Sequence, residues 1–271
     1  MQVKSWNFDI MVYLKFISMS FQRSLAYRVE YFTAILNAFL YIFIFVSVWQ
    51  ALIPEEGLSN GITRESMTAY AVLSTLIKAS FGRSDRLLSQ KVKTGEIATD
   101  LMKPYYFPIM LLSDTIGSTL FQLFSRVIPL LIFCVFLFKI QLPVDSWLLL
   151  KFLPIYFLSF SVFFLLSFLI DTLSFYFVEI FPFYFFYFSL VTLASGAIIP
   201  LDFFPVDLAK ILTYTPFPYL FYFPTMLLLN KPGLPDYSVL LLQYFIWITI
   251  IIGFASLLYR TGLKKLTIAG G

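Results

Sequence analysis

Residues 147–199 read WLLLKFLPIYFLSFSVFFLLSFLIDTLSFYFVEIFPFYFFYFSLVTLASGAII. The charged residues of this stretch are Lys151, Asp171 and Glu179. A helix needs about 20 consecutive apolar residues to cross the hydrocarbon core of a bilayer, so the stretch is too long for one crossing. We expect two membrane spans, at 147–170 and 174–199, that turn at Asp171. The strands of a transmembrane β-barrel would instead be short segments of alternating polarity.

The composition of the whole chain also indicates a helical membrane protein. Of its 271 residues, 60% are hydrophobic and 13% are charged, whereas soluble domains are about 45–50% apolar and about 25% charged. The sequence has no histidine, which excludes imidazole as a catalytic base and histidine as a ligand of haem or zinc. The single cysteine, Cys134, lies in an apolar run, and we expect a buried, unreactive thiol.

Four further apolar blocks complete a prediction of six spans in one domain, 1–271. These blocks are 29–53, 67–81, 109–138 and 237–259. The segment 200–235 contains half of the fourteen prolines and yet stays apolar. Because it is too interrupted to span and too apolar for water, we expect re-entrant or interfacial helices whose backbone is covered by protein.

The N-terminal segment 8–26 has the pattern of an amphipathic helix. Its apolar residues recur at helical spacing at Ile10, Leu14, Ile17, Phe21 and Leu25. Such a helix lies along a membrane surface, although an ordinary cytosolic helix packed on the rest of the protein has the same periodicity. If this segment is cytosolic, six spans place both termini in the cytosol and most lysines and arginines on the inner side. That distribution is typical of bacterial cell-membrane proteins.

The polar segment 85–103 follows the second predicted span. Residues 87–101 read LLSQKVKTGEIATDL, and we expect two helical pieces, 85–94 and 96–102, that are interrupted at Gly95 and stopped before Pro104. The apolar side chains Leu87, Leu88, Val92 and Ile97 could insert into a groove of a partner, while Lys91, Lys93 and Glu96 fix the register. Alternatively, this is a solvated basic loop whose lysines meet anionic lipid headgroups.

Charged residues inside the spans need partners, because each costs about 2.5–3.5 kcal/mol at a helix centre on insertion scales. Lys78, Asp114 and Glu179 are predicted near the inner boundary, where Lys78 could pair with either acid or extend its ammonium to the lipid headgroups. Arg126 lies near the middle of the third span, with no acid at its own depth. It could face a transport path and contact an anionic group of the cargo, or it could form an interhelical hydrogen bond.

The aromatic run 175–188 includes Glu179 and Tyr184 and could line a conduit for a hydrophobic cargo. More often such a run is lipid-facing bulk with an interfacial belt, and helix packing is the default interpretation. With Arg126, these two residues form the candidate transport path.

Three segments together resemble the membrane subunit of ABC type-2 exporters. They are LAYRVEYF at 25–32, KVKTGEIATDLMKPYYF at 91–107 and the proline-rich segment before the last span. One branch carries a motif of a basic residue, any residue, glycine and glutamate, followed by an apolar helix and a proline. The matching residues here are Lys93, Gly95, Glu96, Leu101, Lys103 and Pro104. Many relatives have arginine where this chain has Lys103.

The resemblance implies an all-α permease with six spans that pairs with a second copy, or with a related permease, above two cytosolic ATPase subunits. It also implies that 87–93 is a coupling helix, 8–26 a connector helix and 197–229 a pair of outward-facing re-entrant helices. ATP binding in the ATPases would then move the coupling helix and open a path between the two permeases.

The sequence also indicates which functions to set aside. It lacks the Gly-x-x-x-x-Gly-Lys-Ser/Thr phosphate loop, so we expect that ATP and magnesium are bound by the partner and that no cofactor is bound by this chain. No catalytic constellation stands out, which disfavours a membrane-embedded enzyme and leaves a scaffold as a remote alternative. The main alternative to an exporter of a hydrophobic or amphipathic substrate is an ATP-independent channel or secondary carrier.

Overall fold

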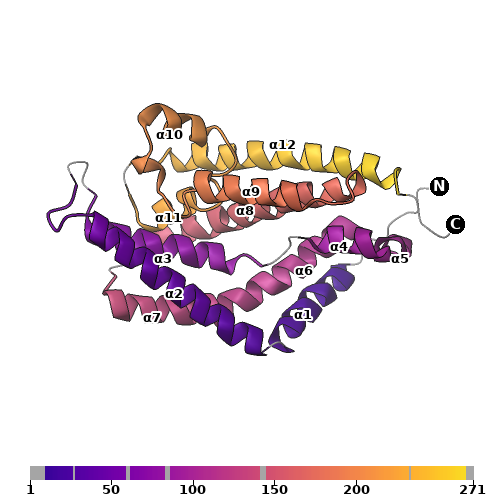
Figure 1. The fold of residues 1–271 in the computed structure, drawn as a ribbon, viewed down its shortest axis with the longest axis horizontal. Coiled ribbons are helices and arrows are strands. Elements are labelled where there is room, and N and C mark those ends of the chain that lie inside the picture. Colours follow the sequence, from indigo (N-terminus) through magenta and orange to yellow (C-terminus); the bar gives the residue numbers. More distant parts are fainter. Residues whose placement is uncertain are drawn as a thin grey trace.

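The computed structural model describes residues 10–26, 28–58, 62–82, 86–140, 145–231 and 233–266. Over these residues the chain is helical, without a strand, and most long helices run roughly along the long axis of the molecule (Figure 1). The helices in chain order are α1 (Ile10–Ala26), α2 (Arg28–Leu52), α3 (Arg64–Ser80), α4 (Leu87–Thr94), α5 (Glu96–Met102), α6 (Phe107–Gln122), the π-helix η1 (Leu123–Val127), α7 (Ile128–Phe138), α8 (Ser146–Asp171), the 3-10 helix η2 (Thr172–Phe175), α9 (Phe181–Ala194), the 3-10 helix η3 (Leu201–Phe203), α10 (Val206–Thr213), α11 (Tyr222–Leu228) and α12 (Tyr237–Leu263).

Each predicted span overlaps a helix, but the helices differ in their capacity to cross a membrane. Four helical stretches are long and apolar enough to cross: Tyr31–Leu52, Phe107–Phe138, Ser146–Phe175 and Tyr237–Leu263. In contrast, α3 has 17 residues and α9 has 14. At 1.5 Å per residue these two helices are about 26 and 21 Å long, less than the about 30 Å of a hydrocarbon core. Length and composition therefore support four crossings, and the other two predicted spans stay a prediction.

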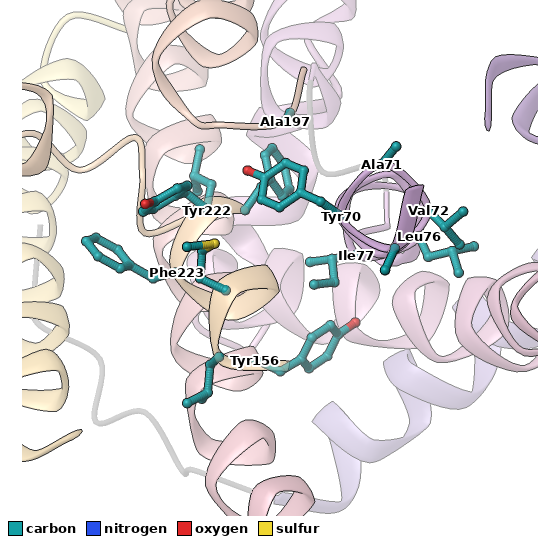
Figure 2. Close-up of a cluster of buried hydrophobic side chains, with 14 of the residues drawn as sticks. Tyr70, Ala71, Val72, Leu76, Ile77, Tyr156, Ala197, Tyr222 and Phe223 are labelled. Carbon is teal, nitrogen blue, oxygen red and sulfur yellow. The ribbon is translucent and has the colours of Figure 1, made fainter. Parts of the chain in front are cut away.

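Helix α3 lies inside the protein rather than against lipid, which explains its low apolarity. Most of its side chains are buried, including the polar Ser74 and Thr75. The Tyr70 hydroxyl donates a hydrogen bond to the Gly196 carbonyl oxygen at 2.5 Å. In Figure 2, Tyr70 points from α3 toward Ala197 and Tyr222. This helix is thus the centre of the larger apolar core, and backbone carbonyls accept hydrogen bonds from Tyr70 and Ser74, whereas the Thr75 hydroxyl has no such partner among the described residues.

The proline-rich segment forms short helices, as predicted, but they differ in environment. All the side chains of α11 from Tyr222 to Leu227 are buried, whereas α10 has no buried residue. The Tyr244 hydroxyl of α12 donates to the Tyr219 carbonyl oxygen at 2.8 Å and so holds the chain just before α11. The aromatic residues of this segment therefore complete the core at one end of the molecule. Whether these helices are re-entrant stays a prediction.

Helix α1 packs closely on α6, and Gly117 permits the contact. A Cβ atom at Gly117 would lie 2.3 Å from the Ile17 carbonyl oxygen. The Ser20 hydroxyl also donates to the Asp114 carbonyl oxygen at 2.7 Å. The predicted apolar residues Ile10, Leu14 and Leu25 remain exposed on another side of α1. The helix therefore both packs on the protein and presents an apolar face, while residues 8 and 9 of the predicted connector helix lie outside the described residues.

We predict that Gly117→Ala lowers the free energy of unfolding by about 1–3 kcal/mol, because the new methyl group overpacks a backbone contact. Thermal unfolding in detergent measures this loss. Gly253→Ala is the matched control: it is also a helical glycine, but no atom would lie within 4 Å of the added Cβ. The control should be neutral or slightly stabilising, since alanine is the better helix former. Equal stability of Gly117→Ala and the wild type would contradict the close packing.

Candidate functional site

Helices α4 and α5 lie together at one end of the molecule, close to the start of α6 and the ends of α8 and α12 (Figure 1). They match the two predicted helical pieces, except that α4 begins at Leu87, after Arg86, and that residue 85 lies outside the described residues. Gly95 joins them with φ +77°, and a Cβ there would meet no atom within 4 Å. The left-handed backbone conformation, rather than crowding, is thus what favours glycine at this position.

A buried carboxylate holds the N-terminus of α4. The carboxylate of Asp171, at the end of α8, accepts hydrogen bonds from the backbone N–H groups of Arg86 and Leu88 at 3.1 and 3.3 Å. The Arg86 N–H also donates to the Tyr184 hydroxyl at 2.7 Å. The first N–H groups of a helix have no partner within the helix, and a negative charge there is favourable. Asp171 therefore acts as an N-cap supplied from a distant part of the chain.

Apolar packing fixes α4 and α5 as well. Leu88 has 0% of its surface exposed and Ile97 has 2%, and both belong to a cluster that we call the α4–α5 core. This core comprises Tyr13, Leu88, Ile97, Tyr105, Phe107, Met110, Leu111, Phe164, Phe168, Phe175, Ala255 and Tyr259. Leu87 and Val92 are half-buried against it. The prediction that Leu88 and Ile97 insert into a partner is therefore wrong, because their side chains are already covered by this chain.

The part of this element that faces solvent is mainly polar. We call it the α4–α5 surface, and it comprises Gln90, Lys93, Thr94, Gly95, Glu96, Thr99 and Met102. Met102 is 80% exposed and is the large apolar side chain of this surface. The predicted residues Lys93, Gly95 and Glu96 thus lie on it, whereas Lys91 is half-buried.

Asp100, which the sequence analysis did not single out, is the centre of the charge network here. Its carboxylate accepts from Lys91, from Lys103 at 2.7 Å and from the Tyr105 hydroxyl at 3.1 Å. Burial by itself would raise the pKa of Asp100, but the hydrogen bonds from Lys103 and Lys91 hold this pKa below its ordinary value. The spacing of Asp100 and Lys103, three residues apart on a helix, could have indicated the pair.

A cavity of about 910 Å³ lies between α1, α2, α3 and the α6–η1 region. Arg126, in the π-helix η1, lines it together with Lys78 of α3 and the Arg23–Asp114 pair. The Arg126 guanidinium donates to the Gln122 side-chain oxygen one turn earlier. Short π segments inside α-helices are frequent at functional sites. The structure thus places Arg126 in a cavity. Of its two predicted roles, contact with an anionic group of the cargo requires such a position.

The charges near the cavity pair differently from the prediction. Asp114 binds Arg23 at 2.8 Å and Glu179 binds Lys93 at 3.0 Å, so neither acid pairs with Lys78. The Lys78 ammonium instead lies 5.9 Å from the ring centroids of Tyr41 and Phe188. The close packing of α1 on α6 brings Arg23 to Asp114, and periodicity along the chain does not reveal which helices will touch.

Glu179 and Tyr184 do not line this cavity, so the structure does not bring the three candidate path residues together. Both contact the α4 region, Glu179 through Lys93 and Tyr184 through Arg86. Most phenylalanines of the run 175–188 are exposed on the outside of the chain. Within the described ranges, no group of three or more Asp, Glu or Cys side chains could hold a metal ion. Cys134 is buried, as predicted.

We predict that Asp171→Ala loosens α4, because the Leu88 N–H loses its acceptor at a cost of about 1–3 kcal/mol, while the Arg86 N–H keeps the Tyr184 hydroxyl. Hydrogen exchange of residues 87–94 should become at least tenfold faster. Asp171→Asn retains one acceptor oxygen and should show a smaller increase. Unchanged exchange in Asp171→Ala would contradict the capping role.

The chain matches the family model described as ABC-2 family transporter protein over residues 32–270. A search among curated proteins finds no match. The match covers most of the chain, including α4, α5 and the cavity-lining parts of α2, α3 and α6. It agrees with the multi-pass architecture indicated by the four membrane-crossing stretches. The chain therefore belongs to the ABC-2 family of transporter proteins and is a transmembrane component of an ABC transporter.

Proposed function

We propose that this chain is the non-catalytic permease subunit of an ATP-driven exporter, and that separate cytosolic ATPase subunits dock on the α4–α5 surface. The observation that carries the proposal is the construction of the α4–α5 element. It presents a solvent-facing surface and is tied to the helices behind it through Asp171 and the α4–α5 core. A mechanical link between an ATPase and a membrane path needs such a rigid, exposed contact.

The contacts of this element account for how force would be transmitted. The α4–α5 core includes side chains from α1, α6, α8 and α12, so a displacement of α4 acts on all four helices at once. Because a packed core resists deformation, we expect these helices to move as bodies. Six spans, both termini in the cytosol of a bacterial cell, and a pair of permeases that forms the path complete the proposal. Its cargo is hydrophobic or amphipathic.

The alternative is an ATP-independent channel or secondary carrier. It predicts transport without any ATPase and assigns the α4–α5 surface no partner. The proposed docking therefore separates the two functions, and it can be tested without knowledge of the cargo.

We predict that the tagged wild-type chain, purified in mild detergent from its native membrane, retains a soluble protein with a phosphate-binding loop in stoichiometric amount. Thr94→Arg and Met102→Asp change exposed side chains of the α4–α5 surface. Each should weaken retention at least tenfold, because each inserts a charge into the contact. Mass spectrometry of the retained proteins gives the measurement.

Asp207→Arg is the control, since Asp207 is exposed on α10 at the opposite end of the molecule (Figure 1). It should retain the ATPase fully, and all three variants should unfold at the wild-type temperature. Recovery of the chain alone, with no ATPase caught by crosslinking through Lys93, would favour the carrier or channel.

A further inference from the structure

The cavity between α1, α2, α3 and η1 carries an excess of positive charge. Its described lining has three cationic side chains, Arg23, Lys78 and Arg126, and one acidic side chain, Asp114. Arg23 binds Asp114 at 2.8 Å. Arg23 thus neutralises the Asp114 carboxylate. Lys78 and Arg126 leave the cavity with a net positive charge, which attracts anions.

Lys78 is the clearest sign that a ligand belongs here. It is half-buried on α3, where a lone ammonium is costly. Among the described residues no carboxylate lies within ion-pairing distance of it, and its ammonium lies over the rings of Tyr41 and Phe188. Aromatic faces stabilise a cation but leave its hydrogen-bond donors available. An anionic oxygen at this position would satisfy those donors.

The lining of the cavity suits an amphiphile. It combines hydrogen-bond donors such as Asn37 and Thr75 with apolar surface such as Ala38 and Phe121. On the neighbouring side of α2, Phe32, Leu36 and Leu40 are exposed.

We propose that this cavity binds the anionic head group of an amphiphile, with a phosphate or carboxylate held by Lys78 and Arg126 and an apolar tail lying along the exposed side of α2. The proposal rests on the proposed function in that it names the class of substrate for the same transporter. The cavity volume of about 910 Å³ falls within the range of small-molecule sites, about 300–1,000 Å³.

The test measures lipid binding to the purified full chain without ATPase or nucleotide. The probes are dioleoyl phosphatidic acid, dioleoyl phosphatidylcholine and inorganic phosphate. We expect phosphatidic acid to bind saturably and at least tenfold more tightly than phosphatidylcholine. Lys78→Gln and Arg126→Gln should each lower the affinity for phosphatidic acid about tenfold, because each substitution removes a charged hydrogen-bond donor. Lys78→Arg should restore binding.

Lys265→Gln is the matched control. Lys265 is exposed, and its ammonium lies 4.6 Å from the Tyr176 ring centroid at the end of the molecule that carries α4. The Lys265→Gln substitution therefore also removes one positive charge from a lysine that lies over an aromatic ring, but this lysine is outside the cavity. Phosphatidic acid should bind this variant as it binds the wild type. Thermal unfolding in detergent should be unchanged in the Lys78 variants, which keeps the test valid if Arg126→Gln folds poorly.

The proposal would be overturned by equal binding of the two lipids, by wild-type binding in Lys78→Gln, or by an equal loss of binding in Lys265→Gln. Displacement of phosphatidic acid by inorganic phosphate alone at millimolar concentration would assign the site to a free anion and would also overturn it. Absence of an ATPase partner would contradict the proposed function without changing these results. Loss of lipid selectivity in a chain that still retains its ATPase would contradict this inference alone.

Discussion

The hydrogen bonds from the N-terminus of α4 to the Asp171 carboxylate are the interaction on which the rest of this structure depends. A short helix at the end of a membrane protein has little stability of its own, because helix nucleation is unfavourable and few of its bonds are internal. Asp171 supplies acceptors to N–H groups that have no partner within the helix. Asp171 ends α8, which belongs to one of the four stretches long and apolar enough to cross a membrane, so α4 is fixed to that part of the protein.

The same constraint, that buried polar groups need partners, explains the interior of the molecule. Helix α3 carries polar side chains into the core, and the hydroxyls of Tyr70 and Ser74 donate to the Gly196 and Ala197 carbonyls. The core there also includes side chains of α11 and of the chain just before it. The α11 part of the proline-rich segment is therefore buried, because its aromatic side chains fill space beside α3 (Figure 2), whereas α10 stays outside the core.

Local features of the sequence predicted the helices well, but they did not predict which helices touch. Apolar blocks located every long helix, and Gly95 and Pro104 predicted the ends of α4 and α5. The prediction that Lys78 pairs with an acid was wrong, because the close packing at Gly117 brings Arg23 of α1 within ion-pairing distance of Asp114. Leu88 was wrongly predicted to contact a partner, because an amphipathic pattern shows which face of a helix is apolar but not what covers that face. The cavity could not be predicted either, since four separate helices form it.

Helix α9 connects the α4 region to the cavity. Glu179, just before α9, binds Lys93 of α4, and Tyr184 accepts a hydrogen bond from the Arg86 N–H. One turn farther along, the Phe188 ring faces the Lys78 ammonium. Under the proposed function, a movement of α4 would shift α9 and with it the ring beside the lysine. Glu179 and Tyr184, first considered as path residues, thus lie between the docking surface and the cavity, where they can link the position of α4 to the environment of Lys78.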